Sequence, residues 1–402
     1  MHKLNPTILE PTGNNLQVVK SDLITKLTLT ITLIFLFLVP FGDGFWDGLP
    51  RVTATLAIGF SSILFLVRGT HRNYNFFHFF SILYIAWQLL SLMWTPDLVR
   101  GKIVAITSVQ LILLAFLFTL VFDSKKKILW AYQAYVLGNI AGSSIIMSNY
   151  FQGIQSPYYN RYGIQNIETD MLSVFLALSI PMAAYLSTKY KNKIIKLINL
   201  MAIPLVFYAI FLTGTRTGSI VGIIGIMYWL FTHRKASASI KAGIVVVMVL
   251  SVVAILSFAP KASTERIFSA GKSISTGTLN YRSVIWGGSL KQWGNAPIIG
   301  SGLGGLGFVL SKEHINFNGA HNAFIHNLTE NGIIGLFLYL SVILSILYYI
   351  LHTPMDEKAF MVALLMVVLV SQLTLHTHTE KITWIIFSLL AAHSSRFAMD
   401  KE

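Results

Sequence analysis

The residues best suited to chemistry lie at the borders of apolar segments. His321 and Asn322 open a polar run that also contains His326 and Glu330 and leads directly into an apolar segment. Histidine has an unperturbed pKa of about 6.5, so it can act as a general base at neutral pH. Polar groups at the end of a membrane helix are costly unless they are partnered or hydrated. We therefore interpret this run as a candidate site, although Glu330 could also serve as a carboxylate in the first turn of the following helix.

Two arginines occupy comparable positions. Arg216 lies in the turn Gly-Thr-Arg-Thr-Gly (214–218), which separates two apolar segments. Arg282 lies at the start of a segment rich in aromatic residues over 281–293. A plain turn and an interfacial helix are the simplest interpretations. Arginine near a membrane, however, requires an anionic partner, and its planar guanidinium can pair bidentately with the oxygens of a pyrophosphate. The helical spacing over 281–293 places on one face Arg282, Trp286, Leu290 and Trp293.

A third polar cluster lies near the carboxyl end of the chain. His376, His378 and Glu380 are spaced two residues apart, so an extended strand would set all three on one face. Such a pattern can bind a metal, but the motif is loose. We predict instead an outer loop that lines the same cavity, and no metal ligand.

These residues must be positioned by a membrane domain. Hydrophobic residues make up 54% of the 402-residue chain and charged residues only 11%, against about 25% in soluble domains. The net charge of +14 is spread in short clusters between apolar runs, which is a topology pattern and argues against nucleic-acid binding. The same charge suits a membrane surface and anionic lipid-linked substrates. The chain contains no cysteine, which excludes disulfides and thiolate chemistry.

About twelve apolar segments are long enough, or nearly so, to span a membrane. They cover approximately 24–41, 52–67, 75–93, 103–122, 128–148, 170–187, 197–213, 218–232, 241–258, 332–351, 359–376 and 382–395. Alternate loops are basic, from Lys20 and Lys26 near the start to Arg396 near the end. This alternation predicts that both termini are cytoplasmic.

The predicted topology is a single transmembrane domain over 1–402 with two long segments outside. The shorter covers 148–170 and includes Arg161 within Asn-Arg-Tyr-Gly. The longer covers 259–331, between the ninth and tenth spans, and is expected to be ordered and functional because it is not of low complexity.

The arrangement of these motifs resembles the bacterial O-antigen ligases. His321-Asn322, nine further residues and Gly332-Ile333-Ile334-Gly335 are similar to the histidine motif of that superfamily. The arginine turn at Arg216 and the helix with Arg282 and Trp286 are similar too. The resemblance covers the chain from about Arg161 onward, whereas the preceding spans match only in number and apolar character.

The resemblance implies an all-α polytopic membrane protein of about twelve transmembrane helices, with a large periplasmic loop that carries short amphipathic helices, in a GT-C-like arrangement. It implies an inverting, metal-independent and cofactor-free glycosyltransferase in the inner membrane of a Gram-negative bacterium, with a periplasmic active site. The donor would be a glycan on undecaprenyl pyrophosphate and the acceptor a sugar hydroxyl of lipid A–core. His321 would be the base, Arg216, Arg282 and Arg161 would bind pyrophosphate, and Asn322, His326 and Glu330 would support them.

Other functions remain open at the level of sequence. An O-antigen or exopolysaccharide polymerase would use the same donor, and a protein O-oligosaccharyltransferase would use serine or threonine. The spacing of the histidine motif and the single large outer loop before it favour a ligase. A lipid-linked sugar transporter or flippase belongs to a different class. Its expected signature is ionisable residues or broken helices in the middle of the membrane.

Overall fold

The computed structural model describes residues 13–68, 74–156, 161–232 and 281–397, together with positions 246 and 253. Every regular element within these ranges is helical, as the sequence predicts. Apart from the two single positions, the predicted span 241–258 lies outside the described residues. Also outside them are Tyr158, Tyr159, Asn160 and the part 259–280 of the predicted outer loop.

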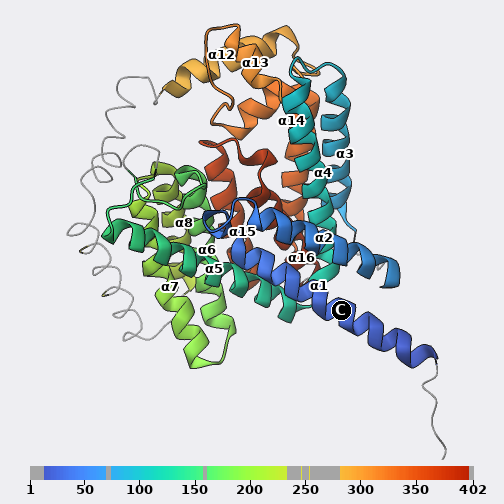
Figure 1. Cartoon of the computed structure of the whole chain (residues 1–402), viewed down its shortest axis with the longest axis vertical. Coiled ribbons are helices and arrows are strands. Elements are labelled where there is room, and N and C mark those ends of the chain that lie inside the picture. Colours follow the sequence, from blue (N-terminus) through green and yellow to red (C-terminus); the bar gives the residue numbers. More distant parts are fainter. Residues whose placement is uncertain are drawn as a thin grey trace, which may run out of the picture.

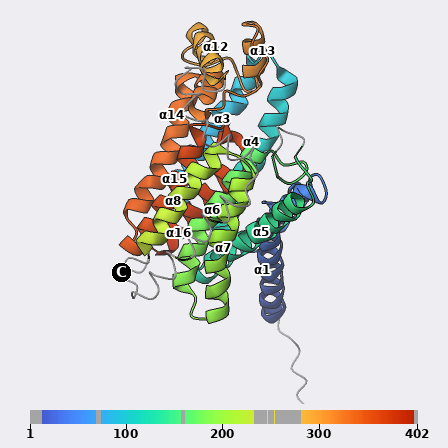
Figure 2. The ribbon, with the colours of Figure 1, turned by 90° about the vertical axis from the view of Figure 1, so that its left-hand side faces the viewer.

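The helices form an elongated bundle (Figures 1 and 2). Its long helices are α1 (Gly13–Leu38), α2 (Leu49–Arg68), α3 (Phe76–Leu90), α4 (Leu98–Val121), α5 (Lys125–Phe151), α6 (Thr169–Lys189), α7 (Lys193–Leu212), α8 (Arg216–Thr232), α14 (Ala323–Leu351), α15 (Met355–Gln372) and α16 (Lys381–Phe397). Two shorter helices, α12 (Arg282–Asn295) and α13 (Leu306–Ser311), lie together over one end of the bundle in both views.

Each predicted apolar segment that falls on described residues coincides with one of these helices. By length and apolar composition, six of the described helical stretches could cross a membrane. They are Leu49–Val67, Phe76–Met93, Leu98–Val121, Thr169–Lys189, Lys193–Leu212 and Ala323–Leu351. The described chain is thus an all-helical protein with several candidate membrane spans.

Helix α6 lies at the centre of one half of the bundle. It packs against α5, α7, α8 and α15, and all its residues from Leu172 to Ser187 are buried. Close approach is possible because α8 presents glycines toward it: a Cβ at Gly225 would lie 2.9 Å from Ile180 and Pro181. Small residues at helix interfaces are a common solution in membranes, where tight packing replaces the hydrophobic effect.

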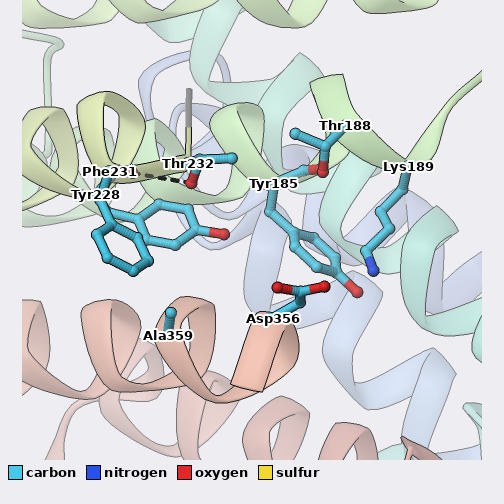
Figure 3. A pocket seen from close by; sticks show the side chains of 8 residues that line it. All are labelled: Tyr185, Thr188, Lys189, Tyr228, Phe231, Thr232, Asp356 and Ala359. Carbon is cyan, nitrogen blue, oxygen red and sulfur yellow. Dashed lines mark hydrogen bonds between the residues drawn. The ribbon is translucent and has the colours of Figure 1, made fainter. Parts of the chain in front are cut away.

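Buried polar side chains tie together the ends of α6, α15 and α16. The Glu357 carboxylate accepts hydrogen bonds from Tyr185 Oη (2.5 Å) and Lys189 Nζ (2.5 Å), and His393 Nε2 lies 3.0 Å away. Beside this network is a cavity of about 350 Å³ whose lining includes Tyr185, Lys189 and Asp356 (Figure 3). Lys189 ends α6 whereas Asp170 lies in its first turn, so the cavity is about 28 Å from that turn at 1.5 Å per residue.

The structure adds detail to two expectations about local structure. The helix predicted to begin near 332 is preceded by a further helical stretch from Ala323, joined to it across a non-helical kink at Gly332, so His326 and Glu330 are helical. The segment from His376 to Glu380, predicted to be a loop, contains a 3₁₀ turn, η4, at Thr377–Thr379. In both places the polar residues are placed by helical turns, which changes which side chains can meet.

Candidate active site

Four helices begin close together, and each carries a charged or titratable side chain at or near its start. Arg216 and Arg282 are the first residues of α8 and α12. Asp170 lies in the first turn of α6, and His321 immediately precedes Asn322, the N-cap of α14. The pKa of Arg282 is affected by Asp170 and Arg216, and that of His321 by Arg282 and Asp170. The four side chains therefore share one electrostatic environment.

This environment is suited to an anion. Burial lowers the pKa of Arg282, Asp170 raises it and Arg216 lowers it, but arginine remains protonated in proteins. The backbone N–H groups and the dipoles of the helix N-termini favour negative charge at the same place. Arg161 adds a third positive charge, and the carboxylates of Asp170, Glu168 and Glu380 lie on the same side of the site.

Arg161 is held by Asp170 at the start of α6. Its Nη1 donates hydrogen bonds to Asp170 Oδ1 (2.7 Å) and Thr169 Oγ1 (2.7 Å), and the residue is only 5% exposed. Thr215, beside Arg216, also reaches Asp170 Oδ1, at 3.3 Å. Asp170 thus connects Arg161 to the arginine turn. Asp170 is not among the site residues predicted from sequence, although an acidic residue in a helix's first turn next to an arginine motif was a usable signal.

Helix α12 is fixed to the segment that carries the histidine. Its buried face consists of Ile285, Gly288 and Ser289, and Thr329 Oγ1 of α14 donates to the Ser289 carbonyl (3.3 Å). Trp286 Nε1 donates to the carbonyl of Ala320 (2.8 Å). The predicted helix is confirmed, with Arg282 as its first residue, but Trp286 is bonded inside the protein and Leu290 is exposed.

His321 adopts a backbone conformation that side-chain-bearing residues rarely take. Its φ is +48°, in the left-handed region, and such outliers persist where surrounding contacts impose them. The next residue, Asn322, is the N-cap of α14: its Oδ1 accepts from the backbone N–H groups of Phe324 and Ile325 at 3.0 Å each. Burial, followed by the charge of Arg282, lowers the pKa of His321. The imidazole is therefore held neutral at neutral pH, as a base requires.

Helix α14 is broken at Gly332, where φ is +65° and ψ is −169°. The backbone groups around the break bond to the segment 297–302. Ser301 N donates to Thr329 O (2.9 Å), Gly302 N donates to Glu330 O (2.8 Å), and Ile333 N donates to Pro297 O (3.0 Å). A Cβ at Gly332 would collide with the backbone of Ile298. The glycine-rich segment is thus an ordered clamp that holds the first turns of α14.

The other three histidines of the two polar clusters, His326, His376 and His378, lie close to His321 and to one another. The ring of His376 is 5.6 Å from that of His321 and 5.4 Å from that of His326, between centroids. His326 in turn lies 4.9 Å from His378 by the same measure, and its Nε2 is 3.3 Å from Glu330 Oε1. The two histidine clusters of the sequence therefore meet in one place.

The carboxyl-terminal cluster is connected to the arginine turn as well. Thr217 Oγ1 and Thr374 Oγ1 are 2.7 Å apart, and Asn322 Nδ2 donates to the carbonyl of Leu373 (3.3 Å). Glu380 does not join the histidines as a ligand set, since the described residues contain no group of three such side chains able to hold a metal ion.

The model of the O-antigen ligase family matches residues 200–340. No curated protein matches the chain. The matched region includes Arg216, Arg282 and His321, whereas Arg161, Asp170 and the segment with His376 lie outside it. Residues 200–340 of the chain are therefore similar to the O-antigen ligase family.

Proposed function

We propose that the protein is an O-antigen ligase of the inner membrane of a Gram-negative bacterium. It transfers a glycan from undecaprenyl pyrophosphate to a sugar hydroxyl of lipid A–core, with inversion at the anomeric carbon and without a metal or other cofactor. The main support for this proposal is that Arg216 and Arg282, each at a helix N-terminus, lie near His321, whose pKa is lowered.

The chemistry follows from these positions. His321 accepts the proton of the acceptor hydroxyl while the hydroxyl oxygen forms a bond to the anomeric carbon. The bond from that carbon to the pyrophosphate oxygen breaks, and its electrons remain on undecaprenyl pyrophosphate. Arg216 and Arg282 stabilise the negative charge that develops there, which fixed donors in a partly dehydrated site do effectively.

Supporting residues act through those three. Arg161 adds positive potential at the donor site, but its ion pair with Asp170 gives it the further task of holding the first turn of α6 beside Arg216. Asn322 caps α14 directly after His321. His326 and Glu330 form a second layer behind the base.

Orientation in the membrane is part of the proposal. The basic loops predict cytoplasmic termini, which places the arginines and His321 on the periplasmic side, under α12 and α13. The residues from 259 to 331 would then be the periplasmic segment. The cavity beside Lys189 would open toward the cytoplasmic side, where Lys191, Lys193 and Lys196 also lie.

A transporter is less well supported. Broken helices are typical of transporters because freed backbone groups can bind an ion or substrate, and α14 is broken at Gly332. Here, however, backbone groups flanking the break bond to Pro297, Ser301 and Gly302. Those groups are already used within the protein.

The test is transfer by the purified protein in lipid nanodiscs. An undecaprenyl-pyrophosphate glycan and lipid A–core are supplied together, and the glycan is followed on a gel. Glycan on lipid A–core supports the ligase. Longer lipid-linked chains with an unmodified core identify a polymerase, and translocation of donor without any transfer identifies a transporter.

A further inference from the structure

The histidines behind the candidate base form a graded series. His321, which precedes α14, is electrostatically coupled to Arg282. His326, in the first turn of α14, lies 3.3 Å from the carboxylate of Glu330. His376 lies between them, with ring centroids 5.6 and 5.4 Å away. The series therefore runs from a cationic environment to an anionic one.

The middle histidine is placed by packing that leaves it little freedom. Gly319 lies against its ring, and a Cβ added at Gly319 would come within 2.5 to 2.8 Å of three atoms of the His376 imidazole. The rings of His376 and His326 are stacked at an interplanar angle of 28°, and that of His321 stands edge-on to His376 at 81°. A residue without a side chain at 319 is thus what lets His376 reach this position.

One nitrogen of each ring in the series has no partner within the protein. In the described part of the chain, the buried Nδ1 atoms of His321, His326 and His376 form no hydrogen bond. Buried polar atoms without a partner are uncommon and call for an explanation. Each ring of the series therefore has a nitrogen, Nδ1, at which it can accept or release a proton.

We propose that His376 and His326 carry the proton away from His321, toward Glu330, during each glycan transfer. This inference rests on the proposed function and extends it to the fate of the abstracted proton. A proton retained on His321 is repelled by Arg282, whereas one on His326 is attracted by the Glu330 carboxylate, which also accepts from the Leu306 backbone N–H (3.1 Å). His326 and His376 are positioning residues here, because they act through His321.

The transfer balances without any co-reactant. The acceptor hydroxyl gives its proton to one nitrogen of His321, and His321 releases the proton from its other nitrogen. His376 accepts that proton on one nitrogen and releases one from the other, and His326 becomes an imidazolium beside Glu330. When the products leave, the proton passes to solvent or to a phosphate oxygen of the released undecaprenyl pyrophosphate, so that His321 is neutral again for the next transfer. No group is oxidised or reduced.

The charged groups that face the series set its pH dependence. Arg282 and Asp170 lie near His321, Arg100 lies near His376, and Glu330 and His378 lie beside His326, while the three histidines also act on one another. Removing the negative charge of Glu330 leaves the positive charge of Arg282 without this compensation. The histidines of the series should then bind a proton less tightly. This effect tests the electrostatic coupling of Glu330 to the histidines, and the transfer of protons along the series is tested by the rate measurements.

The first experiment measures single-turnover rates of glycan transfer in mixtures of H₂O and D₂O. In the wild type, the plot of rate against deuterium fraction should curve, because several protons move. His376→Gln and Glu330→Gln should lower the rate about 10- to 100-fold with unchanged donor Kd, and should make the plot linear. Gly319→Ala, which alters no titratable group, should act like His376→Gln. His352→Gln, an exposed histidine at the far end of α14, is the matched control and should behave as wild type.

A linear plot for the wild type, or a His376→Gln rate within twofold of the wild type, overturns the relay. A second measurement needs no turnover: ¹⁵N NMR of labelled histidines in nanodiscs. Glu330→Gln should shift the acid titration of the series downward, and His352→Gln should leave it in place. Unchanged titration in Glu330→Gln also overturns the relay. Failure of the relay while His321→Ala abolishes transfer leaves the ligase proposal intact, whereas no transfer by the wild type refutes the ligase itself.

Discussion

Trp286 Nε1 donates a 2.8 Å hydrogen bond to the carbonyl oxygen of Ala320, so the helix that begins with Arg282 is tied to the residue before His321. Through this bond one contact positions both Arg282, the proposed donor-binding residue, and His321, the proposed base. The geometry of the candidate site should therefore be sensitive to a change that touches neither of them.

Trp286→Phe tests that sensitivity. The aromatic character remains but the bond to Ala320 is lost, and a net hydrogen bond contributes about 1 kcal/mol, so the rate of glycan transfer should fall about fivefold. Trp293→Phe is the comparison, because it removes an indole bond of the same helix to Pro297, whose carbonyl bonds to α14 at Ile333 and not beside His321. Equal rates for the two variants would contradict the positioning role of Trp286.

A second prediction concerns the buried ion pair. Asp170→Asn removes the carboxylate from Arg161, which is 5% exposed, and should lower the free energy of unfolding by about 3 kcal/mol. Arg161→Met combined with Asp170→Asn should be less harmful, because no charge remains buried without its partner. Thermal unfolding in detergent measures both. The control, Asp22→Asn, breaks an exposed ion pair with Lys26 and should not change the free energy of unfolding measurably. If Asp170→Asn loses no more stability than this control, the account of Arg161 is refuted.

The pH dependence of transfer follows from His321. Only the neutral imidazole accepts a proton, so the rate falls as pH drops through its pKa. Since burial and Arg282 lower that pKa from 6.5, the acid limb of the rate profile should have its midpoint below 6.5. Arg282→Gln removes a positive charge, so its limb should move upward, while Arg282→Lys should keep the limb in place. A limb centred above 6.5 in the wild type would argue against His321 as the base.

The break in α14 gives a prediction about folding. Gly332 has a positive φ, and a Cβ there would collide with the Ile298 backbone, so Gly332→Ala should strongly reduce the yield of folded protein and abolish transfer. Gly287→Ala is the control, because an added Cβ meets nothing within 4 Å and alanine favours the helix. Size-exclusion chromatography in detergent compares the two. A folded, active Gly332→Ala would show that the clamp is dispensable.

Much of the helical architecture was predictable because membrane spans are encoded in long apolar runs. Every such segment on described residues is a helix, and the helix beginning at Arg282 follows from its aromatic spacing. The start of α14 was not predictable in this way. Its first turns are polar, and they are helical because the segment 297–302 and the Asn322 cap satisfy their backbone groups.

The candidate site was predictable in its residue types but not in its contacts. Hydrogen-bonding chemistry identified Arg216, Arg282 and His321 individually. The pairing of Arg161 with Asp170 and the meeting of His376 with His321 depend on how α6, α8, α14 and α15 pack. No local pattern in the sequence carries that information.

The most direct test of the central claim compares the wild type with His321→Ala in nanodiscs that contain undecaprenyl-pyrophosphate glycan and lipid A–core. His352→Gln serves as the control. The account predicts that the wild type and the control place glycan on lipid A–core and that His321→Ala does not. Transfer by His321→Ala at the wild-type rate, or elongation of the lipid-linked glycan with an unmodified core, would contradict it.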